Sequence, residues 1–88
     1  MKWYIKVFYK FFGYDICDFV PCEWCGKRAV NIHHIKKRGM GGSKKLDVIE
    51  NLASVCMEHH TKADNEPEFN EKLKQKHLIN VANGYIKI

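Results

Sequence analysis

Thiols and imidazoles of this chain stand in three groups with the spacing of metal ligands: Cys22 and Cys25, then His33 and His34, then Cys56 with His59 and His60. Such side chains are the ligands that zinc prefers, and a structural zinc site is normally closed by four of them. The set therefore exceeds what one zinc ion needs. The sequence predicts a second site for the surplus histidines.

The zinc ligands can be assigned from their spacing. Cys22-x-x-Cys25 and Cys56-x-x-His59 each place two ligands where one tight turn can aim both at the same ion, and Gly26 permits the backbone reversal that such a turn requires. His59, rather than its neighbour, repeats the two-residue gap of the first pair. These four residues are expected to hold a structural Zn²⁺, which leaves His33, His34 and His60 for chemistry.

The cysteine count leaves a disulfide interpretation open. Four cysteines could form two disulfides in a secreted protein, and a single C-x-x-C could be a redox motif. Lys6 and Lys10 interrupt the apolar stretch from Trp3 to Phe12, so neither a signal peptide nor a membrane span is expected. We therefore predict an intracellular location with reduced thiols. Cys17 is left over and is expected to be a small buried hydrophobe, although it could replace one of the four ligands.

Positive charge is concentrated around the histidine pair. The net charge of +5 and the pI near 9.1 favour anionic partners. The stretch from Lys27 to Lys45 contains many basic residues and no acidic one. A charge run is usually a solvated face, but the position of this run around His33 and His34 indicates phosphate binding. The candidates for nucleic-acid contacts are Lys36, Lys37, Arg38, Lys44 and Lys45.

One small α+β domain is expected over residues 1–88, because no repeat, low-complexity tract or linker divides the chain. A domain of this size has a small core and is expected to need a structural metal. Its core motif spans residues 22–64, with an N-terminal flank at 1–20. A C-terminal helix is expected at about 66–83, and residues 85–88 are expected to add an edge strand.

The elements around the histidines follow from local patterns. A strand over 29–35 and a second, antiparallel strand over 52–55 flank a loop marked by Gly39, Gly41, Gly42 and Ser43. We favour a helix over a strand for residues 3–12, although Lys2, Lys6 and Lys10 share one helical face in a stretch that also alternates as a strand would. His60 and Asp64 would share one face of a helix.

The C-terminal helix is expected to be capped at Asn65 and to have Pro67 in its first turn. Its buried stripe is predicted to contain Phe69, Leu73, either His77 or Leu78, and Val81.

The constellation C-x-x-C, His-His, Asn and C-x-x-H-H resembles the zinc-stapled HNH endonucleases, and the resemblance covers about Cys22 to Asp64. It implies a ββα-metal core of two antiparallel strands and a helix that grip one divalent ion beside the scissile phosphate. A free-standing domain this small is similar to those that bacteriophages carry.

The resemblance implies a role for each matching residue. His34 would be the general base, His33 and His60 would bind the catalytic ion, and Asn51 would fix the loop and orient the base. Some relatives have a further histidine that binds the catalytic ion, and this chain has Asp64 at that position. A carboxylate oxygen suits a hard cation, so Asp64 is the remaining candidate ligand. The catalytic ion would be Mg²⁺, Mn²⁺ or Ni²⁺, separate from the structural Zn²⁺.

The function implied is hydrolysis of DNA phosphodiester bonds, with double-stranded DNA as the expected partner. Imidazole ordinarily titrates near pH 6.5 and can accept a proton from water, while a divalent ion stabilises the leaving oxygen. The products would carry 5′-phosphate and 3′-hydroxyl ends. The alternative is a noncatalytic zinc-binding module that holds DNA or a protein, which would need the cysteines and basic residues but no second histidine cluster.

Overall fold

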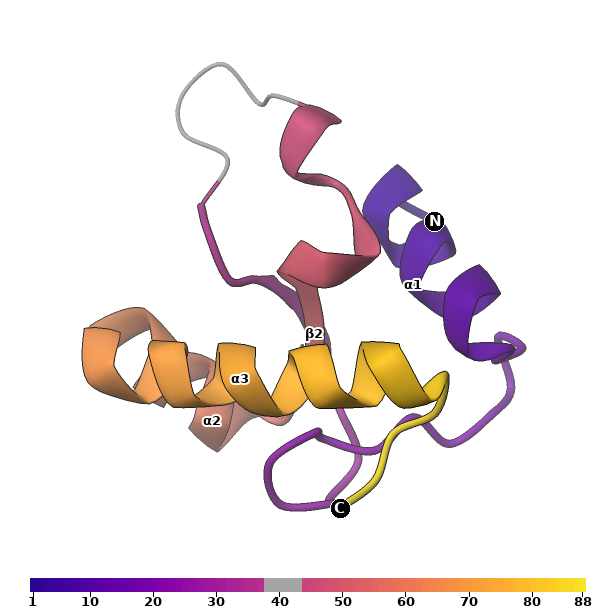
Figure 1. Cartoon of the computed structure of the whole chain (residues 1–88). Helices are drawn as coiled ribbons and strands as arrows, with labels where there is room; N and C mark the ends of the chain where they lie inside the picture. Colours follow the sequence, from indigo (N-terminus) through magenta and orange to yellow (C-terminus); the bar gives the residue numbers. More distant parts are fainter. Residues whose placement is uncertain (38–43) are drawn as a thin grey trace.

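The computed structural model describes residues 1–37 and 44–88. These residues form a small α+β fold of three helices and one two-stranded antiparallel sheet (Figure 1). No helix among them is both long and apolar enough to cross a bilayer. Their order is α1 (Trp3–Phe12), β1 (Asn31–His34), a short 3-10 turn (Lys44–Leu46), a second (Ile49–Asn51), β2 (Leu52–Val55), α2 (Met57–Asn65) and α3 (Pro67–Asn83).

The N-terminal stretch is the helix that the sequence favoured. α1 ends where Gly13 adopts a left-handed conformation with a φ of 75°, which glycine adopts at little steric cost. Phe8 is fully buried beneath the helix. Lys2, Lys6 and Lys10 are exposed, as their helical spacing predicted.

Strand pairing places the two adjacent histidines on opposite faces of the sheet. β1 is shorter than the expected 29–35, whereas β2 has the expected bounds. The antiparallel register pairs His33 with Ala53 and His34 with Leu52. Because successive side chains alternate across a strand, His33 faces α2 and α3, while His34 faces α1. Both sides of the sheet therefore contribute to any site that uses the pair.

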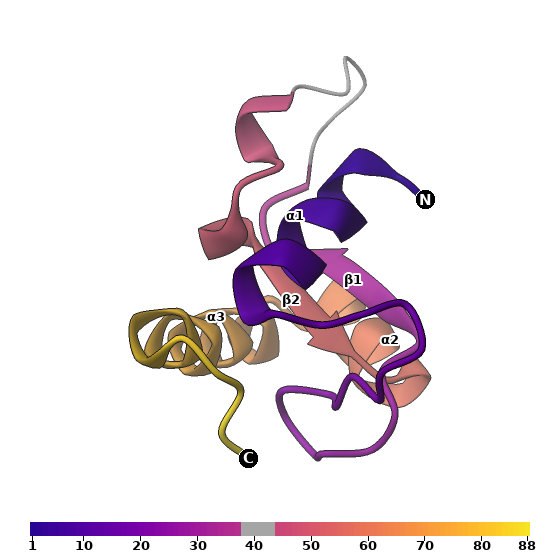
Figure 2. The same cartoon turned by 90° about the vertical axis from the view of Figure 1, so that its right-hand side faces the viewer.

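Each face of the sheet packs on its own apolar cluster, and helices cover both faces (Figure 2). On one side Phe8 of α1 packs with Val20, Ile32 and Leu52. On the other side the cluster joins the zinc-ligand turns to α2 and α3, through Cys22, Ile35, Ala53, Val55, Cys56, Ala63, Phe69 and Leu73. The sheet thus lies between α1 and the C-terminal helices.

The C-terminal helix differs from expectation in its details. Glu66, not Asn65, precedes the first turn, since Asn65 is the last residue of α2. Pro67 begins α3, and Gly84 ends it with a φ of 80°. On its inner face Asn80 is buried in place of the expected Val81. His77, rather than Leu78, completes the stripe.

The expected strand at 85–88 was wrong. The backbone N–H of Lys87 donates to the Asn80 side-chain oxygen at 3.0 Å rather than to a strand partner. The side chain of Ile88 lies against Gly26, where an added Cβ would meet it at 3.2 Å. The tail therefore folds back along α3 to the turn that carries two of the thiols.

Candidate metal centres and catalytic pocket

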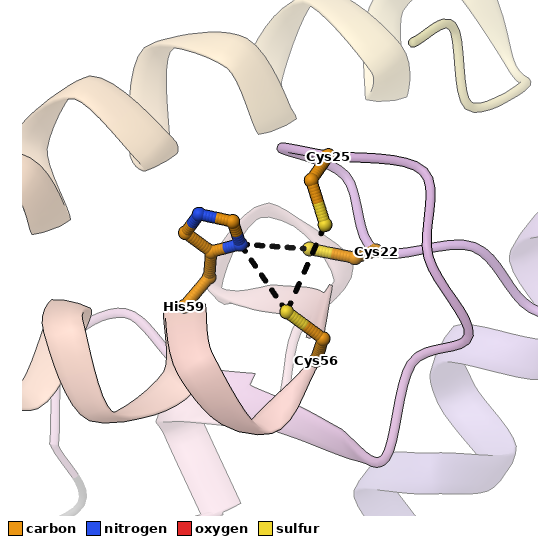
Figure 3. A group of neighbouring side chains, drawn as sticks. All are labelled: Cys22, Cys25, Cys56 and His59. Carbon is orange, nitrogen blue, oxygen red and sulfur yellow. Dashed lines mark hydrogen bonds between the residues drawn. The ribbon is translucent and has the colours of Figure 1, made fainter.

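Cys22, Cys25, Cys56 and His59 meet at one point, as their spacing predicted (Figure 3). Their ligand atoms all lie within 4.8 Å of one another. Cys25 Sγ lies 3.8 Å from Cys56 Sγ, and His59 Nδ1 lies 3.8 Å from Cys22 Sγ and 3.2 Å from Cys56 Sγ. Ligand atoms of a tetrahedral zinc ion are separated by about 3.5–3.8 Å. The cluster is therefore compatible with a structural zinc site.

The thiols are free, and their surroundings shift the pKa values of Cys22 and Cys25 in opposite directions. Burial alone would raise the pKa of Cys22, but backbone N–H groups of Cys25, Cys56 and Trp24 act together against it and lower that pKa. Burial raises the pKa of Cys25, and the neighbouring thiols add to the effect. A bound cation would favour the thiolate form of both. With all four cysteines free, the disulfide interpretation is wrong.

Cys17 is exposed, so its expected role as a buried hydrophobe was wrong. It lies in a surface turn in which the N–H of Asp18 donates to the carbonyl of Asp15 at 3.0 Å. It is also not part of the four-ligand cluster among the described residues. The ligand assignment that used the other three cysteines therefore agrees with the geometry.

A second group joins β1 to α2: His33, His60 and Asp64. His33 Nδ1 lies 3.8 Å from Asp64 Oδ1, and His60 Nε2 lies 3.5 Å from Asp64 Oδ2. One turn of helix separates His60 from Asp64, so both side chains face the strand. Three ligands of this kind could hold a divalent ion and leave positions for water and a phosphate oxygen.

Asn70 of α3 fixes the orientation of His33. Its Oδ1 accepts a hydrogen bond from His33 Nε2 at 2.9 Å, and its Nδ2 donates to the carbonyl of Ile35 at 2.8 Å. A neutral imidazole carries one N–H, so this contact leaves the Nδ1 lone pair directed at the Asp64 side. Burial lowers the pKa of His33, although Asn70 and Asp64 act in the opposite direction. A neutral ring is the form that binds a metal.

His34 is held from the other side of the sheet by Asp47. His34 Nε2 donates to Asp47 Oδ1 at 2.7 Å, and the two side chains are 15% and 3% exposed. The ring of Tyr4, from α1, meets His34 edge-on with 4.5 Å between ring centroids. Because Nε2 carries the proton in this contact, Nδ1 is the nitrogen that can accept one from water.

Asn51 ties the two ends of the chain segment between the strands. Its Oδ1 accepts from the N–H of Lys36 at 2.7 Å, and its Nδ2 donates to the carbonyls of Lys36 and Leu46 at 3.0 and 2.9 Å. The loop-fixing part of its expected role fits these contacts. The contact that orients His34 comes instead from Asp47, which the sequence did not single out.

The histidines from both faces of the sheet line one cavity of about 290 Å³ along β1. Its walls are Tyr4, Asn31, Ile32, His33, His34, Lys37, His60 and Asp64. Among the basic residues expected to bind phosphate, Lys37 is part of this wall, and Lys36 and Lys45 are exposed. Arg38, the glycine-rich loop and the side chain of Lys44 lie outside the described residues. The cavity combines a possible cation site, a proton acceptor and a lysine.

Three residues with positioning contacts were not predicted. Tyr4 and Asn70 belong to the flanks beyond the recognised motif, and no spacing rule relates them to the histidines. Asp47 is the first acidic residue after the basic stretch. Its position between the two predicted strands, close after the basic stretch, was the one available signal for it.

No family model matches the chain, and no curated protein or solved structure matches it.

Proposed function

We propose that the protein is a metal-dependent DNA endonuclease of the HNH type, with β1, β2 and α2 as a ββα-metal core. The observation that carries this proposal is the shared cavity in which His34 lies beside the group His33, His60 and Asp64. A noncatalytic zinc module has no use for a proton acceptor set next to a second candidate metal site.

In the proposed reaction His34 accepts the proton of the attacking water. Asp47 holds the imidazole through Nε2 at 2.7 Å, which leaves Nδ1 as the nitrogen that would act as the base. Tyr4 packs on the ring and limits its rotation. Proton transfer to a positioned base is worth about 10²–10⁴-fold in rate in enzymes generally.

His33, His60 and Asp64 would hold the divalent ion, Mg²⁺, Mn²⁺ or Ni²⁺. When bound, this ion neutralises charge on the phosphate and stabilises the leaving 3′ oxygen. Asn70 keeps Nδ1 of His33 free for it, because Nε2 is engaged at 2.9 Å. Asn31 has its Nδ2 3.5 Å from His60 Nδ1, so its amide can orient the second imidazole.

Lysines around the cavity would bind the phosphates on either side of the cut. Lys37 lines the cavity itself, and Lys36 and Lys45 are exposed. Contacts of this kind carry no sequence information and weaken as salt rises. We therefore propose that affinity is largely independent of sequence.

The test is a plasmid nicking assay with Zn²⁺-loaded protein and added Mg²⁺, Mn²⁺ or Ni²⁺. Wild type is expected to nick, and His34→Ala is expected to lose activity while keeping one zinc ion per chain. Nicking by His34→Ala at the wild-type rate would refute the mechanism. A single metal per chain and no nicking with any cation would favour the noncatalytic module.

The adjacent histidines of α2 offer a matched pair of variants. His59→Cys replaces one zinc ligand by another, so it is expected to retain both zinc and nicking. His60→Ala is expected to retain zinc and lose nicking. The reverse result, with zinc lost from His60→Ala, would exchange the roles of the two residues.

A further inference from the structure

A second and larger hollow lies on the α1 side of the molecule. It has a volume of about 830 Å³ and is lined by Trp3, Lys6, Val7, Lys10, Phe11, Asp47, Val48, Ile49 and Glu50. We call it the α1 groove. One wall is α1 and the other is the segment 47–50 that leads into β2. Sites that take small organic groups such as nucleobases fall in the range of about 300–1,000 Å³.

The α1 wall has two exposed aromatic rings with two lysines between them along the helix. Trp3 is 62% exposed and Phe11 is 41% exposed, so both rings are accessible to a ligand in the groove. They stand eight residues apart on the helix, about 12 Å along its axis. Lys6 and Lys10 lie on the same wall of the groove. Proteins that bind single strands combine stacking rings with cations in this way.

The opposite wall differs in chemistry. Val48, 44% exposed, and Ile49 offer apolar surface, while Glu50 offers an exposed carboxylate. Carboxylates repel phosphates but accept hydrogen bonds from the N–H groups of bases, which include the exocyclic amines and the N3–H of thymine. A strand lying with its phosphates toward Lys6 and its base edges toward Glu50 would meet complementary groups on both walls.

The groove lies next to the proposed catalytic cavity. Asp47 lines the groove and also accepts the hydrogen bond of His34 at 2.7 Å. Tyr4, on the same helix as Trp3, lines the cavity and packs on His34. A strand that leaves the cavity beside His34 would therefore have α1 within reach.

We infer that the α1 groove binds an unpaired DNA strand next to the scissile phosphate, with bases stacked on Trp3 and Phe11. The inference rests on the proposed nuclease function and adds a substrate class to it, DNA with single-stranded segments. Base faces are available for stacking only where bases are unpaired, whereas a duplex presents base edges and phosphates. A duplex would leave these aromatic rings without partners.

Binding can be measured without cleavage in a His34→Ala background. The probes are a fluorescein-labelled oligo-dT strand and a duplex of the same length. Trp3→Ala is expected to weaken strand binding roughly 5- to 100-fold, and Phe11→Ala to weaken it in the same direction. Ile79→Ala is the matched control, since Ile79 is 61% exposed on α3 and does not line the groove.

The lysines have a separate readout in the salt dependence. Each phosphate contact on a single strand contributes about 0.7 to the slope of log K against log salt. The double variant Lys6→Ala/Lys10→Ala is expected to reduce the magnitude of this salt-dependence slope by about 1.4. Lys72→Ala/Lys74→Ala, on the exposed surface of α3, is the matched control and is expected to leave it unchanged.

Stacking itself can be observed by fluorescence. The chain has two tryptophans, so Trp24→Phe leaves Trp3 as the single emitter. Its emission is expected to be quenched by oligo-dT. Binding with unchanged emission, or duplex binding as tight as that of the strand, would overturn the inference. A dimer that Trp3→Ala disrupts without changing strand binding would assign the groove to a second copy and overturn it too.

Failure of this inference can be told from failure of the nuclease proposal. If wild type nicks plasmid while Trp3→Ala binds the strand as well as its parent, the groove inference alone fails. If the strand binds in the groove and quenches Trp3 but no cation supports cleavage, the nuclease proposal alone fails.

Discussion

Removal of the Asp47 carboxylate tests whether the His34 imidazole is held as a base. Asp47 Oδ1 and His34 Nε2 are 2.7 Å apart, and the carboxylate side chain is 3% exposed. Asp47→Ala deletes the acceptor, after which either ring nitrogen of His34 can carry the proton and the ring can turn. Both changes reduce the fraction of molecules in which Nδ1 is available as the free base.

The size of the effect follows from the type of contact. A hydrogen bond to a charged group contributes about 1.5–3 kcal/mol, and a neutral one about 0.5–1.5 kcal/mol. If this energy holds the reactive arrangement, Asp47→Ala should slow cleavage roughly 10- to 150-fold. Asp47→Asn keeps an oxygen acceptor without the charge, so it should lose only about tenfold.

The assay is single-turnover nicking with saturating Mn²⁺, together with Mn²⁺ affinity and the ¹⁵N NMR spectrum of the ring. Affinity for Mn²⁺ should stay unchanged, because His33, His60 and Asp64 are intact. The wild-type spectrum should show a protonated Nε2 on His34, and Asp47→Ala should show both tautomers. Asp15→Asn, at an exposed carboxylate, is the control. Cleavage by Asp47→Ala within twofold of wild type would refute the reasoning.

Further predictions concern the two metal groups. Removal of zinc with EDTA is expected to unfold the domain, since structural zinc contributes an apparent ~10–16 kcal/mol to folding. Circular dichroism would show the loss of helix. A melting temperature that EDTA leaves unchanged would contradict this prediction. Asn70→Ala is expected to weaken Mn²⁺ binding about 10- to 100-fold by calorimetry, whereas Asn65→Ala, at an exposed residue, should not. Because burial lowers the pKa of His33, the folded chain binds fewer protons than the unfolded chain below about pH 6.5. The contribution of His33 to the free energy of unfolding is therefore present above about pH 6.5 and is lost as the pH falls. Urea midpoints at about pH 7.5 and 5.5 should therefore differ more for wild type than for His33→Gln; equal differences would contradict the assignment.

The parts of the fold that the sequence predicted are those that local chemistry determines. Ligand pairs two residues apart led to the four-residue zinc cluster, because a tight turn alone sets the distance between Cys22 and Cys25. β2 followed from a short apolar run, and the start and end of α3 followed from Pro67 and Gly84. In each case the signal itself is local: a two-residue gap, a short apolar run, or a single proline or glycine.

The misses share a different cause, since each depends on a contact made far along the chain. Asn80 replaces Val81 in the core because its amide donates to Glu23 Oε1 at 2.9 Å and its oxygen holds the tail through Lys87. The same contact prevents the expected terminal strand. Asp47 and Asn70 orient histidines 13 and 37 residues away. Periodicity and spacing contain no information about such pairs.

A buried polar network connects the zinc cluster to the residues that orient His33. Glu23, between the first two thiols, is fully buried and accepts from His77 Nδ1 at 2.8 Å and from the N–H of Ser54 at 2.9 Å. His77 Nε2 lies 2.5 Å from the carbonyl oxygen of Ile49, so the ring bridges Glu23 and the segment that precedes β2.

Removing one partner of such a buried hydrogen bond leaves the other unsatisfied, which generally costs about 1–3 kcal/mol. The pair holds α3 in a fixed position against the zinc turn, and Asn70 lies on the same helix. A zinc ion bound by the four ligands would have no part in the proposed chemistry. It would nevertheless help to keep His33 in place, because α3 contacts both the zinc-ligand turn and His33. The contacts of the zinc-ligand turn and of the proposed catalytic residues thus meet in one helix, which lies outside the motif that resembles HNH endonucleases.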